Sequence, residues 1–575
     1  MCGIFLVYAK KESLNLNRCI KSSIKIKDRG PDKLLKKYFK KKNLFMSNSI
    51  LSITGSNKRN SSIYQSQNKK NYLIYNGEIY NWLKLRERKK KLSKCINDSD
   101  LLINLHQNYK HIEVPKKLNG MFAYCIFDLK KNKLFFCSDT QGEKKIFYYN
   151  DDKFFILSSN ISSIITFVKQ ELNKNAIKNY LYTRHFLFLN ETIYKKINII
   201  TPGYLFTFDL DRKILSHIIF DNPINWINKN KYLRLNNKKE DEVINNLYKK
   251  FKKTLSNMIP NKKFASIFSG GIDSSLQTML IKEIKEPDII ATLHHEKKDP
   301  ITQKINIFEK YVKQKIYKII VNKKTYSNLL KKCFQITKFP LLTHDFVGKY
   351  QISNFFEKKK CKVFFAADGA DELFGGYKVY SKLNWKKSRT EVISPYTQNI
   401  STDKKNKQKI LINELRDKVY KKYYFIRNKT ERSMQTTLFL DYFIQSIYVG
   451  NIGTDIMCGA NGIEPRNMYI QKEIIKEAIN LPIKYKINIK SKDKKMILKP
   501  ILKKIFIKYF PERLLFEKQG FSGFPNESDS ITKFAINKNL VKFFNKHVDI
   551  FNKANQWKLL NLNYFVNFCK IKFSL

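Results

Sequence analysis

The stretch Phe264-Ala265-Ser266-Ile267-Phe268-Ser269-Gly270-Gly271-Ile272-Asp273-Ser274-Ser275 decides the fold of the second half of the chain. It begins as a short apolar run that is typical of a buried strand, and residues 276–281 after it favour a helix. The glycines allow a close approach to the backbone, and the free N–H groups of a first helical turn attract an anion. We therefore predict a strand, a glycine loop and a helix N-terminus that hold a phosphate group.

The loop lacks the lysine of the common P-loop, because no Gly-Lys-Ser/Thr follows the glycines. A metal ion held by Asp273 can supply the missing positive charge. The alternative is a glycine turn that Asp273 and Ser274 merely cap. Ser269-Gly270-Gly271-Ile272-Asp273-Ser274 resembles the pyrophosphate loop of enzymes that split ATP into AMP and pyrophosphate, and the order of strand, loop, acid and hydroxyls favours this interpretation over the capped turn.

A second acidic loop follows another predicted buried strand, 363–367. It reads Asp368-Gly369-Ala370-Asp371-Glu372 and continues to Tyr377. Residues 288–293 predict a further parallel strand between the two loops. Open α/β sheets bind ligands at the carboxyl ends of their strands, so we expect this loop at a ligand site. A solvated acidic turn is the alternative.

The composition limits the classes of function. The 575 residues predict two or three domains, and 43% are hydrophobic, which is enough for proper cores. The net charge of +61 would ordinarily raise nucleic-acid or membrane binding. Here the lysines are spread along the whole chain, without a basic stripe or an arginine-rich arm. We interpret the charge as compositional bias on solvated faces, and nucleic-acid binding remains an alternative that rests on charge alone.

The cysteines and the apolar runs indicate a cellular compartment. Nine cysteines are widely scattered without a Cys-x-x-Cys, which argues against a disulfide framework or a structural zinc site. No apolar run reaches the ~18 residues of a membrane span. The first residues lack the basic region of a signal peptide. We therefore expect a cytoplasmic protein with no membrane partner and no specific nucleic-acid partner.

The N-terminal half begins Met1-Cys2-Gly3. Loss of Met1 would leave Cys2 with a thiol nucleophile and its own α-amino group as general base. Taken alone, Cys2 is more simply interpreted as a small buried hydrophobic residue. Further on, polar turns separate four predicted strands of an antiparallel meander: 121–128, 134–138, 145–149 and 154–158.

Several segments together resemble the class II glutamine amidotransferase domain. They are Cys2-Gly3-Ile4, Arg29-Gly30-Pro31-Asp32, Asn76-Gly77-Glu78-Ile79-Tyr80-Asn81 and Asn119-Gly120-Met121-Phe122-Ala123. With the Ser269–Ser275 loop, nearly the whole chain resembles the glutamine-hydrolysing asparagine synthetase family. Two later segments, Glu464-Pro465-Arg466 and Glu517-Lys518-Gln519-Gly520-Phe521, resemble shorter motifs of that family.

The resemblance implies an α+β N-terminal-nucleophile domain, with two antiparallel sheets between helices, over residues 1–210. A predicted strand, 203–210, closes this domain, and residues 211–239 form a linker. An α/β parallel-sheet ATP-pyrophosphatase domain with a helical C-terminal part would follow over residues 240–575.

The resemblance also implies the chemistry of the second half. The side-chain carboxylate of the substrate aspartate would attack the α-phosphorus of ATP, which gives an acyl-adenylate and pyrophosphate. Ammonia would then displace AMP from the acyl-adenylate. The cofactors are ATP and Mg²⁺, and Asp273 and Asp371 would hold the metal through hard carboxylate oxygens. Lys518 would neutralise charge during adenylation, and Asp368 would accept a proton from the attacking nitrogen. The implied ATP-binding residues are Phe268, Ser269, Gly270, Gly271, Asp273, Ser274, Ser275, Leu293, Ala366 and Ala367.

For the first half, the resemblance implies a glutaminase that supplies the ammonia. Cys2 would attack the side-chain amide of glutamine, and Asn76 and Gly77 would form the oxyanion hole. Glu78 and Asp98 would bind the substrate, with Asp98 holding its α-amino group. The ammonia would then pass between the domains, shielded from water.

Three departures from the family pattern concern ligand binding. Relatives carry His-x-Arg-Leu-Ser-Ile, whose arginine binds the glutamine α-carboxylate, whereas this chain has Ile50 at that position. Isoleucine cannot replace a bidentate guanidinium contact. The Arg-Asp-x-x-Gly-x-Lys-Pro-Leu segment is eroded at 138–146, and the acidic and alanine pattern is missing from 297–314. These departures predict a weakened glutaminase and leave some nucleotide contacts unassigned.

The sequence leaves the acceptor open. The first hypothesis is an enzyme that makes asparagine from aspartate, with glutamine or ammonia as nitrogen donor. The second keeps the ligase chemistry but takes a sugar-linked or peptidyl carboxylate. The third is a degenerate amidotransferase that acts as a scaffold, against which the intact acidic and glycine loops argue. The sequence also leaves the oligomeric state open, and a homodimer is the assembly we expect.

Overall fold

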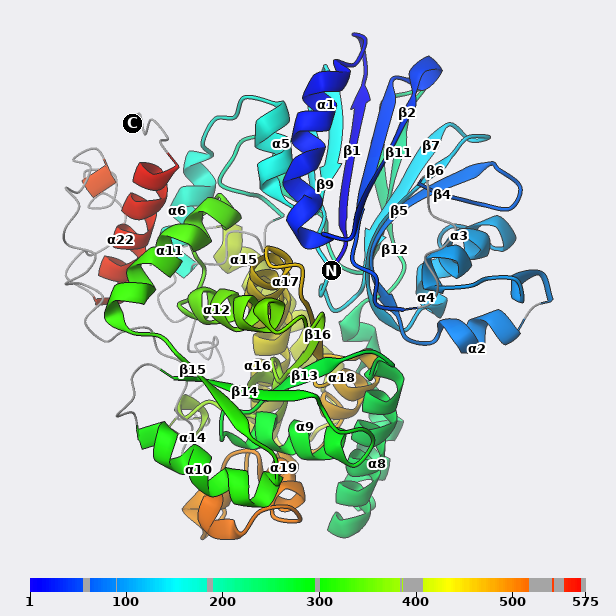
Figure 1. Cartoon of the computed structure of the whole chain (residues 1–575). Helices are drawn as coiled ribbons and strands as arrows, with labels where there is room; N and C mark the ends of the chain where they lie inside the picture. The colour runs from blue at the N-terminus through cyan, green and yellow to red at the C-terminus, as the bar shows by residue number, and fades with distance from the viewer. Residues whose placement is uncertain are drawn as a thin grey trace.

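The computed structural model describes residues 1–54, 63–88, 90–183, 190–294, 300–382, 385, 407–516, 540–541 and 553–569. The chain forms two halves that lie against each other, and the N-terminus lies between them (Figure 1). In the described part of the chain, no helix is both long and apolar enough to cross a membrane.

The N-terminal half contains two six-stranded sheets whose strands pair antiparallel. The order of the first is β10-β8-β9-β1-β3-β2 and that of the second is β12-β11-β7-β6-β5-β4. The strands are β1 (Gly3–Ala9), β2 (Lys33–Phe39), β3 (Leu44–Ile50), β4 (Tyr64–Gln65), β5 (Asn71–Ile79), β6 (Gly120–Asp128), β7 (Lys133–Ser138), β8 (Phe147–Asn150), β9 (Phe154–Ser158), β10 (Ile197–Ile199), β11 (Tyr204–Asp209) and β12 (Leu215–Ile219). An apolar core lies between the sheets, and Phe136 and Phe155 meet in it with ring centroids 5.8 Å apart.

Helices cover the outer faces of both sheets, with α1 and α5 on one side and α2 and α3 on the other (Figure 1). The helices of this half are α1 (Leu16–Ser23), η1 (Ile24–Arg29), η2 (Lys40–Lys42), α2 (Trp82–Glu87), η3 (Lys90–Leu92), α3 (Asp98–Asn108), α4 (Val114–Lys117), α5 (Ile161–Phe167) and α6 (Lys174–Thr183). The predicted sandwich of two antiparallel sheets between helices is therefore confirmed.

Two features of this half differ from expectation. The four strands predicted as one meander are present, but β6 and β7 lie in the second sheet and β8 and β9 in the first. The chain crosses between sheets because β7 and β9 contribute aromatic side chains to the same core. In addition, β12 follows β11 and pairs with it, so the second sheet continues beyond residue 210.

The second half is built on a five-stranded sheet with the order β15-β14-β13-β16-β17, and all four pairings are parallel. Its strands are β13 (Phe264–Ile267), β14 (Ile289–His294), β15 (Ile316–Ile320), β16 (Val363–Ala366) and β17 (Glu464–Asn467). Alternate residues of β13 and β16 pack into different cores on the two faces. A sheet buried on both faces explains why these strands are short continuous apolar runs.

Helices surround this sheet, as predicted. They are η5 (Pro223–Trp226), α7 (Lys229–Asn237), α8 (Glu240–Met258), α9 (Ile272–Lys282), α10 (Pro300–Val312), α11 (Lys323–Thr337), α12 (Asp345–Lys358), α13 (Ala370–Phe374), α14 (Val379–Lys382), α15 (Lys407–Lys422), α16 (Lys429–Asp441), η6 (Tyr442–Gly450), α17 (Asn451–Gly459), α18 (Lys472–Ala478), η7 (Ile483–Tyr485), η8 (Lys494–Met496), α19 (Pro500–Phe506), η9 (Glu512–Leu514) and α22 (Lys553–Phe568). Of these, η5 and α7 lie in the segment expected to be the linker.

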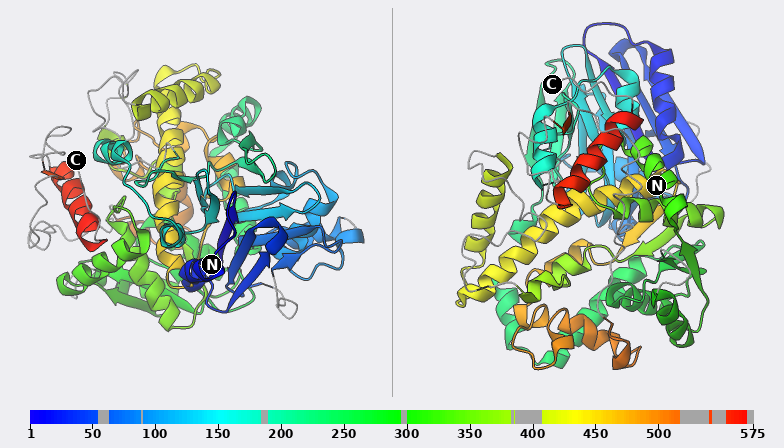
Figure 2. Two further views of the ribbon diagram at one scale, coloured as in Figure 1. Left: turned by 90° about the horizontal axis from the view of Figure 1, so that it is seen from above. Right: turned by 90° about the vertical axis from the view of Figure 1, so that its left-hand side faces the viewer.

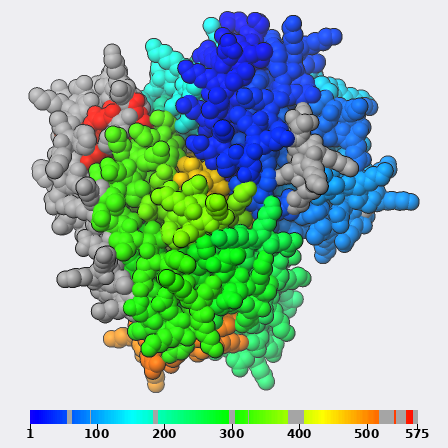
Figure 3. Space-filling model, viewed as in Figure 1, coloured from blue at the N-terminus to red at the C-terminus, as the bar shows by residue number. Residues whose placement is uncertain are grey.

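Several elements of the second half contact the first half, and two of them are long helical segments. The first is a long helical rod in which α16, the π-helical segment η6 and α17 follow one another, drawn in yellow in the right view of Figure 2. The second is α22, which packs on α6 of the first half and α11 of the second. In the space-filling view, the blue first half and the green second half meet along a continuous contact, with gold atoms between them (Figure 3).

Candidate active site

The predicted glycine loop lies between β13 and α9. The Ser269 N–H donates to Ser274 Oγ at 3.0 Å, and the two serine hydroxyls lie 2.8 Å apart. Gly270 has φ +73°, a left-handed conformation that favours glycine. The serine contacts fold the loop back onto the first turn of α9, which is the arrangement expected of a phosphate-binding loop.

The parallel sheet brings the other predicted nucleotide residues to the same edge. Leu293 lies near the end of β14, Ala366 ends β16, and Ala367 follows it. Phe268, just after β13, is fully buried and packs against Phe308, with ring centroids 5.2 Å apart. Because all these strands run in parallel, their carboxyl ends meet at one edge, where open α/β sheets hold ligands.

The two predicted metal ligands converge on a lysine that sequence reasoning missed. Lys499 Nζ lies 2.5 Å from Asp273 Oδ2 and 2.5 Å from Asp371 Oδ1. Its side chain is only 5% exposed, so three charged groups meet in a nearly buried position. Lys499 itself has φ +52°, a conformation that costs a residue with a Cβ about 1–2 kcal/mol.

The two carboxylates fit a divalent cation. One oxygen of each carboxylate contacts the Lys499 ammonium, so the two oxygens are close enough together to bind one cation. In the described part of the chain, the second oxygen, Asp273 Oδ1, is buried without a hydrogen-bond partner. No cluster of three or more His, Cys, Asp or Glu side chains that could bind a metal exists among the described residues. A Mg²⁺ here would therefore need oxygens from phosphate and water to complete its shell.

Asp368 precedes Asp371 by three residues in the acidic loop and is held by groups from two helices. Thr454 Oγ1 of α17 donates to Asp368 Oδ2 at 2.9 Å. Lys349 Nζ of α12 lies 3.7 Å from the same oxygen and 2.8 Å from Asp345 Oδ2. Burial opposes ionisation of Lys349, but these two carboxylates prevail and raise its pKa. The Asp368 side chain remains 33% exposed, so it is open to a substrate.

Cys2 lies just before β1 in the first half, at the boundary between the halves. The Leu51 N–H donates to Cys2 Sγ at 3.4 Å, and burial raises the pKa of the thiol. Gly77 has φ +153°, and a Cβ there would lie 2.1 Å from the Met121 carbonyl oxygen. Both polar side-chain atoms of Asn76 are buried and have no hydrogen-bond partner in the described part of the chain. An unsatisfied buried amide is costly, which makes Asn76 a candidate to bind an absent ligand.

Asp98, the first residue of α3, and Glu78 of β5 are two buried carboxyl groups that interact electrostatically. Asp98 Oδ2 accepts from the Tyr75 hydroxyl at 2.9 Å and from the Ile79 N–H at 3.1 Å. Burial raises the pKa of Asp98, and burial together with Asp98 raises that of Glu78 to about 8. Arg466 of β17 approaches Glu78 to 3.6 Å, so the second half contributes a cation to this group.

Ile50 is an apolar residue in the core between the two sheets, with 4% of its surface exposed. Lys58, a cation close to Ile50 in the sequence, lies outside the described residues. Another cation, Arg29, donates to the Cys2 carbonyl oxygen and pairs with Asp455 at 2.8 Å. These contacts occupy the Arg29 guanidinium, so Arg29 does not replace the arginine that binds the glutamine α-carboxylate in relatives.

A small polar cavity lies between the halves and adjoins the Asp368 region. Its volume is about 10 Å³, roughly the space of one water molecule. Its lining combines residues of both halves: Met121, Glu143, Lys144, Asn451, Thr454, Asp455, Pro465 and Asn467. Thr454 and Asn467 also contact Asp368, at the side chain and at the N–H respectively.

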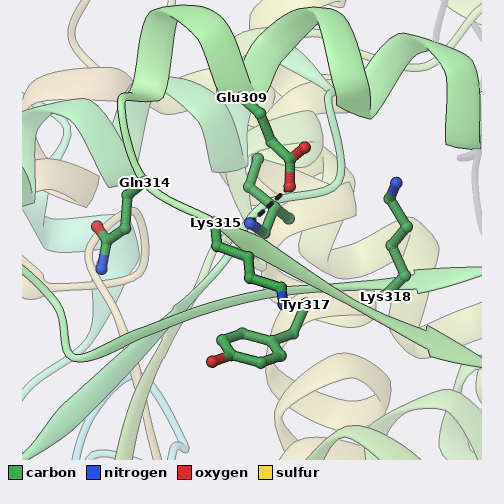
Figure 4. Close-up of a pocket in the computed structure, with 6 residues that line it drawn as sticks. Glu309, Gln314, Lys315, Tyr317 and Lys318 are labelled. Atoms are coloured by element: carbon green, nitrogen blue, oxygen red, sulfur yellow. Dashed lines mark hydrogen bonds between the residues drawn. The ribbon is translucent and has the colours of Figure 1, made fainter.

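Other parts of the prediction are not located here. Lys518 and the whole Glu517–Phe521 segment lie outside the described residues. A larger open hollow of about 550 Å³ runs along the outer edge of β15, lined by residues such as Glu309, Lys315 and Tyr317 (Figure 4). It contains none of the predicted site residues. Sequence reasoning missed Lys499, Lys349 and Thr454, since no motif marks them in a chain so rich in lysine.

Known proteins resemble both halves of the chain. A family model for the glutamine amidotransferase domain matches residues 1–217, and one for asparagine synthase matches residues 248–548. A putative glutamine-hydrolysing asparagine synthetase of Methanocaldococcus jannaschii is 29% identical over 314 residues, 53% of this chain and 58% of that protein. Asparagine synthetase 1 of Bacillus subtilis is 27% identical over 319 residues, 54% of this chain and 48% of that protein.

The human asparagine synthetase is 24% identical over 408 residues, which cover 66% of this chain and 68% of the human protein. The chain thus spans about half to two thirds of the length of these curated relatives. The asparagine synthase model matches more than half of the 575 residues and covers both the glycine loop and the acidic loop. Together with the glutamine amidotransferase match over the first half, this shows that the chain belongs to the asparagine synthase family.

Proposed function

We propose that this protein is an ATP-dependent amide synthetase that converts aspartate, ATP and glutamine or ammonia into asparagine, AMP and pyrophosphate. The division into a glutaminase domain, a linker and a synthetase domain is part of this proposal. The observation that carries it is the convergence of Asp273, Asp371 and Lys499 beside the glycine loop, with Asp368 in the same acidic loop as Asp371. This arrangement supports the proposal, because charge-compensating groups would stabilise a leaving pyrophosphate.

The first step activates a carboxylate. The substrate carboxylate attacks the α-phosphorus of ATP, so that an acyl-adenylate forms and pyrophosphate leaves. The N–H groups of the Ser269–Ser275 loop and the Lys499 ammonium compensate the charge that develops on the leaving group. Asp273 and Asp371 would hold Mg²⁺, which supplies further positive charge against the phosphate oxygens.

The second step transfers nitrogen. Ammonia attacks the acyl carbon and AMP leaves, and the attacking nitrogen must then lose a proton. Asp368 would accept it, and this role is supported by a carboxylate that is partly exposed and held by Thr454 and Lys349. The polar cavity that adjoins Asp368 on the side of the first half supports delivery of ammonia from that direction.

The ammonia comes from glutamine in this proposal. Cys2, freed of Met1, attacks the side-chain amide, and its α-amino group acts as base. The unpartnered Asn76 amide and the Gly77 N–H receive the oxyanion. Asp98 would bind the substrate ammonium, and Glu78 would line the same pocket.

The charges near Asp368 favour an amino acid acceptor. Asp345 and Asp368 with Lys349 between them carry a net charge of one negative unit when both acids are ionised. A substrate ammonium group would balance that charge. A sugar-linked or peptidyl carboxylate, the second candidate acceptor, lacks this group next to the reacting carboxylate.

The test is release of pyrophosphate from ATP in the presence of ammonium and a panel of carboxylates. The panel contains aspartate, N-acetyl-aspartate, a peptide with an internal aspartate and a sugar acid. Asparagine synthesis requires release with aspartate and little with the blocked forms. Release with a blocked or sugar-linked acid alone would favour the second acceptor class, and no release with any acid would refute the proposal. Cytoplasmic location and a homodimer remain predictions.

A further inference from the structure

Arg29 connects the nucleophile of the first half to a helix of the second half. Its Nε donates to the Cys2 carbonyl oxygen at 3.1 Å. Its Nη2 pairs with Asp455 Oδ1 at 2.8 Å, and its Nη1 donates to the Asp455 carbonyl oxygen at 3.2 Å. The side chains of Arg29 and Asp455 are 4% and 0% exposed, so this pair is shielded from solvent screening.

The helix α17 is shaped to receive this arginine. A Cβ at Gly459 would lie 2.7 Å from Arg29 Nη1, so a larger residue there would displace the guanidinium. One turn along, a Cβ at Gly462 would lie 2.9 Å from Pro31 Cδ. The Arg29–Pro31 segment is thus seated on the end of α17, in the region where the N-terminus meets the second half in Figure 1.

The same helix holds the synthetase side of the reaction. Thr454, next to Asp455, donates to Asp368 Oδ2. Five residues therefore form an uninterrupted path: Cys2, Arg29, Asp455 with its neighbour Thr454, and Asp368. Two further cations face Asp455: Lys144, whose Nζ lies 3.7 Å from Oδ1, and Lys145, which interacts with it electrostatically.

We infer that Arg29 and Asp455 are positioning residues that couple the two active sites, so that occupation of the synthetase site through α17 sets the placement of Cys2. This inference rests on the proposed function. A substrate that binds Asp368 changes the hydrogen bond between Thr454 and Asp368, and this change biases the position of α17. A rigid buried arginine transmits that bias because it binds both the helix and the Cys2 backbone.

The direct test measures how fast an electrophilic glutamine analogue alkylates Cys2, with and without ATP and the acceptor. We expect these substrates to change the alkylation rate of the unmodified enzyme about fivefold or more, the lower end of usual coupling energies. In Asp455→Asn, which keeps the shape but removes the charge, the rate should become the same within about twofold under both conditions. Arg29→Lys keeps the charge but cannot span the three acceptors, and it should behave in the same way.

A second readout is the number of glutamates formed for each pyrophosphate released. This ratio should rise in both variants, because glutamine hydrolysis would no longer depend on whether the synthetase site is occupied. Lys362→Met is the matched control. Lys362 pairs with Asp32 across the same boundary at 2.7 Å, but on its exposed rim and without contact to Cys2 or Asp368. The control should keep both the substrate response and the original ratio.

Three results would overturn the inference. One is an unmodified enzyme whose Cys2 reacts equally with and without the synthetase substrates. Another is an Asp455→Asn variant with full response, and the third is equal loss in Lys362→Met. Loss of ammonium-dependent synthesis together with a lower Tm in both Asp455→Asn and Arg29→Lys would also count against it, since the pair would then be structural. Failure of the proposed function is recognised separately, because no carboxylate would release pyrophosphate from the unmodified enzyme.

Discussion

Lys499 Nζ lies 2.5 Å from Asp273 Oδ2, although the two residues are 226 positions apart in the chain. The glycine loop carries no lysine of its own, and Lys499 reaches it from the turn before α19. Its approach requires a glycine on the other side. A Cβ at Gly376 would lie 2.0 Å from Lys499 Cε and 1.9 Å from Asp371 Oδ1.

We expect Lys499→Met to slow pyrophosphate release roughly 100- to 1,000-fold, as removal of one transition-state charge contact does elsewhere. The variant also leaves Asp273 and Asp371 without their common cation. Its Tm should therefore be lower than that of the unmodified protein without Mg²⁺ and should recover more on addition of Mg²⁺. Thermal unfolding with and without Mg²⁺ tests this, and an equal response of both proteins would contradict it.

Asp273→Ala and Asp371→Ala should each abolish pyrophosphate release with either nitrogen source, because both carboxylates are assigned to the metal. The measurement is pyrophosphate release with ammonium and, separately, with glutamine. Near-normal turnover in either variant would show that the metal assignment is wrong.

Cys2→Ala should remove glutamine-dependent synthesis and spare synthesis from ammonium. The reason is that the Cys2 thiol takes part only in the proposed glutamine reaction, whereas Asp368 lies in the other half. Product formation is compared at saturating ammonium and at saturating glutamine. Equal loss of both activities would assign a structural role to Cys2.

Ile50→Arg should lower the glutamine KM and leave ammonium-dependent turnover unchanged. The missing charged contact is worth on the order of 1.5–3 kcal/mol, or roughly ten- to a hundredfold in affinity. Ile50→Met, which preserves the apolar character of this buried position, is the matched control and should not change the KM. If the unmodified enzyme already saturates with glutamine at sub-millimolar concentration, another group binds the glutamine α-carboxylate and the prediction is wrong.

The buried Lys486 should make the free energy of unfolding depend on pH. It is fully buried, and burial lowers its pKa from 10.5 to about 7. Between these values the unfolded chain binds a proton that the folded chain does not, so this residue makes the free energy of unfolding rise with pH. Relative to Lys486→Met, the unmodified protein should gain about 1.4 kcal/mol per pH unit between pH 7 and pH 9. The Tm difference between the two proteins, measured at pH 7, 8 and 9, tests the sign.

Short apolar runs and glycines made much of the architecture predictable. The strand predicted at 288–293 is β14, Ile289–His294, and the one predicted at 363–367 is β16, Val363–Ala366. Sheet membership was not predictable for β8 and β9, because strands of similar local pattern pack in either sheet. Contacts with Phe136 and Phe208 across the core place Phe155 opposite the second sheet.

The sequence by itself determined the local chemistry of this protein: the glycine loop at Ser269–Ser275, the acidic loop from Asp368, and the cysteine at position 2. These depend on neighbours in the chain, since backbone freedom, helix starts and turn acids are local properties. Tertiary structure alone selected Lys499 from 110 lysine and arginine residues and paired Arg29 with Asp455. Long charged side chains carry no local pattern of their own, so their partners are decided only when folding buries them and requires each charge to be balanced.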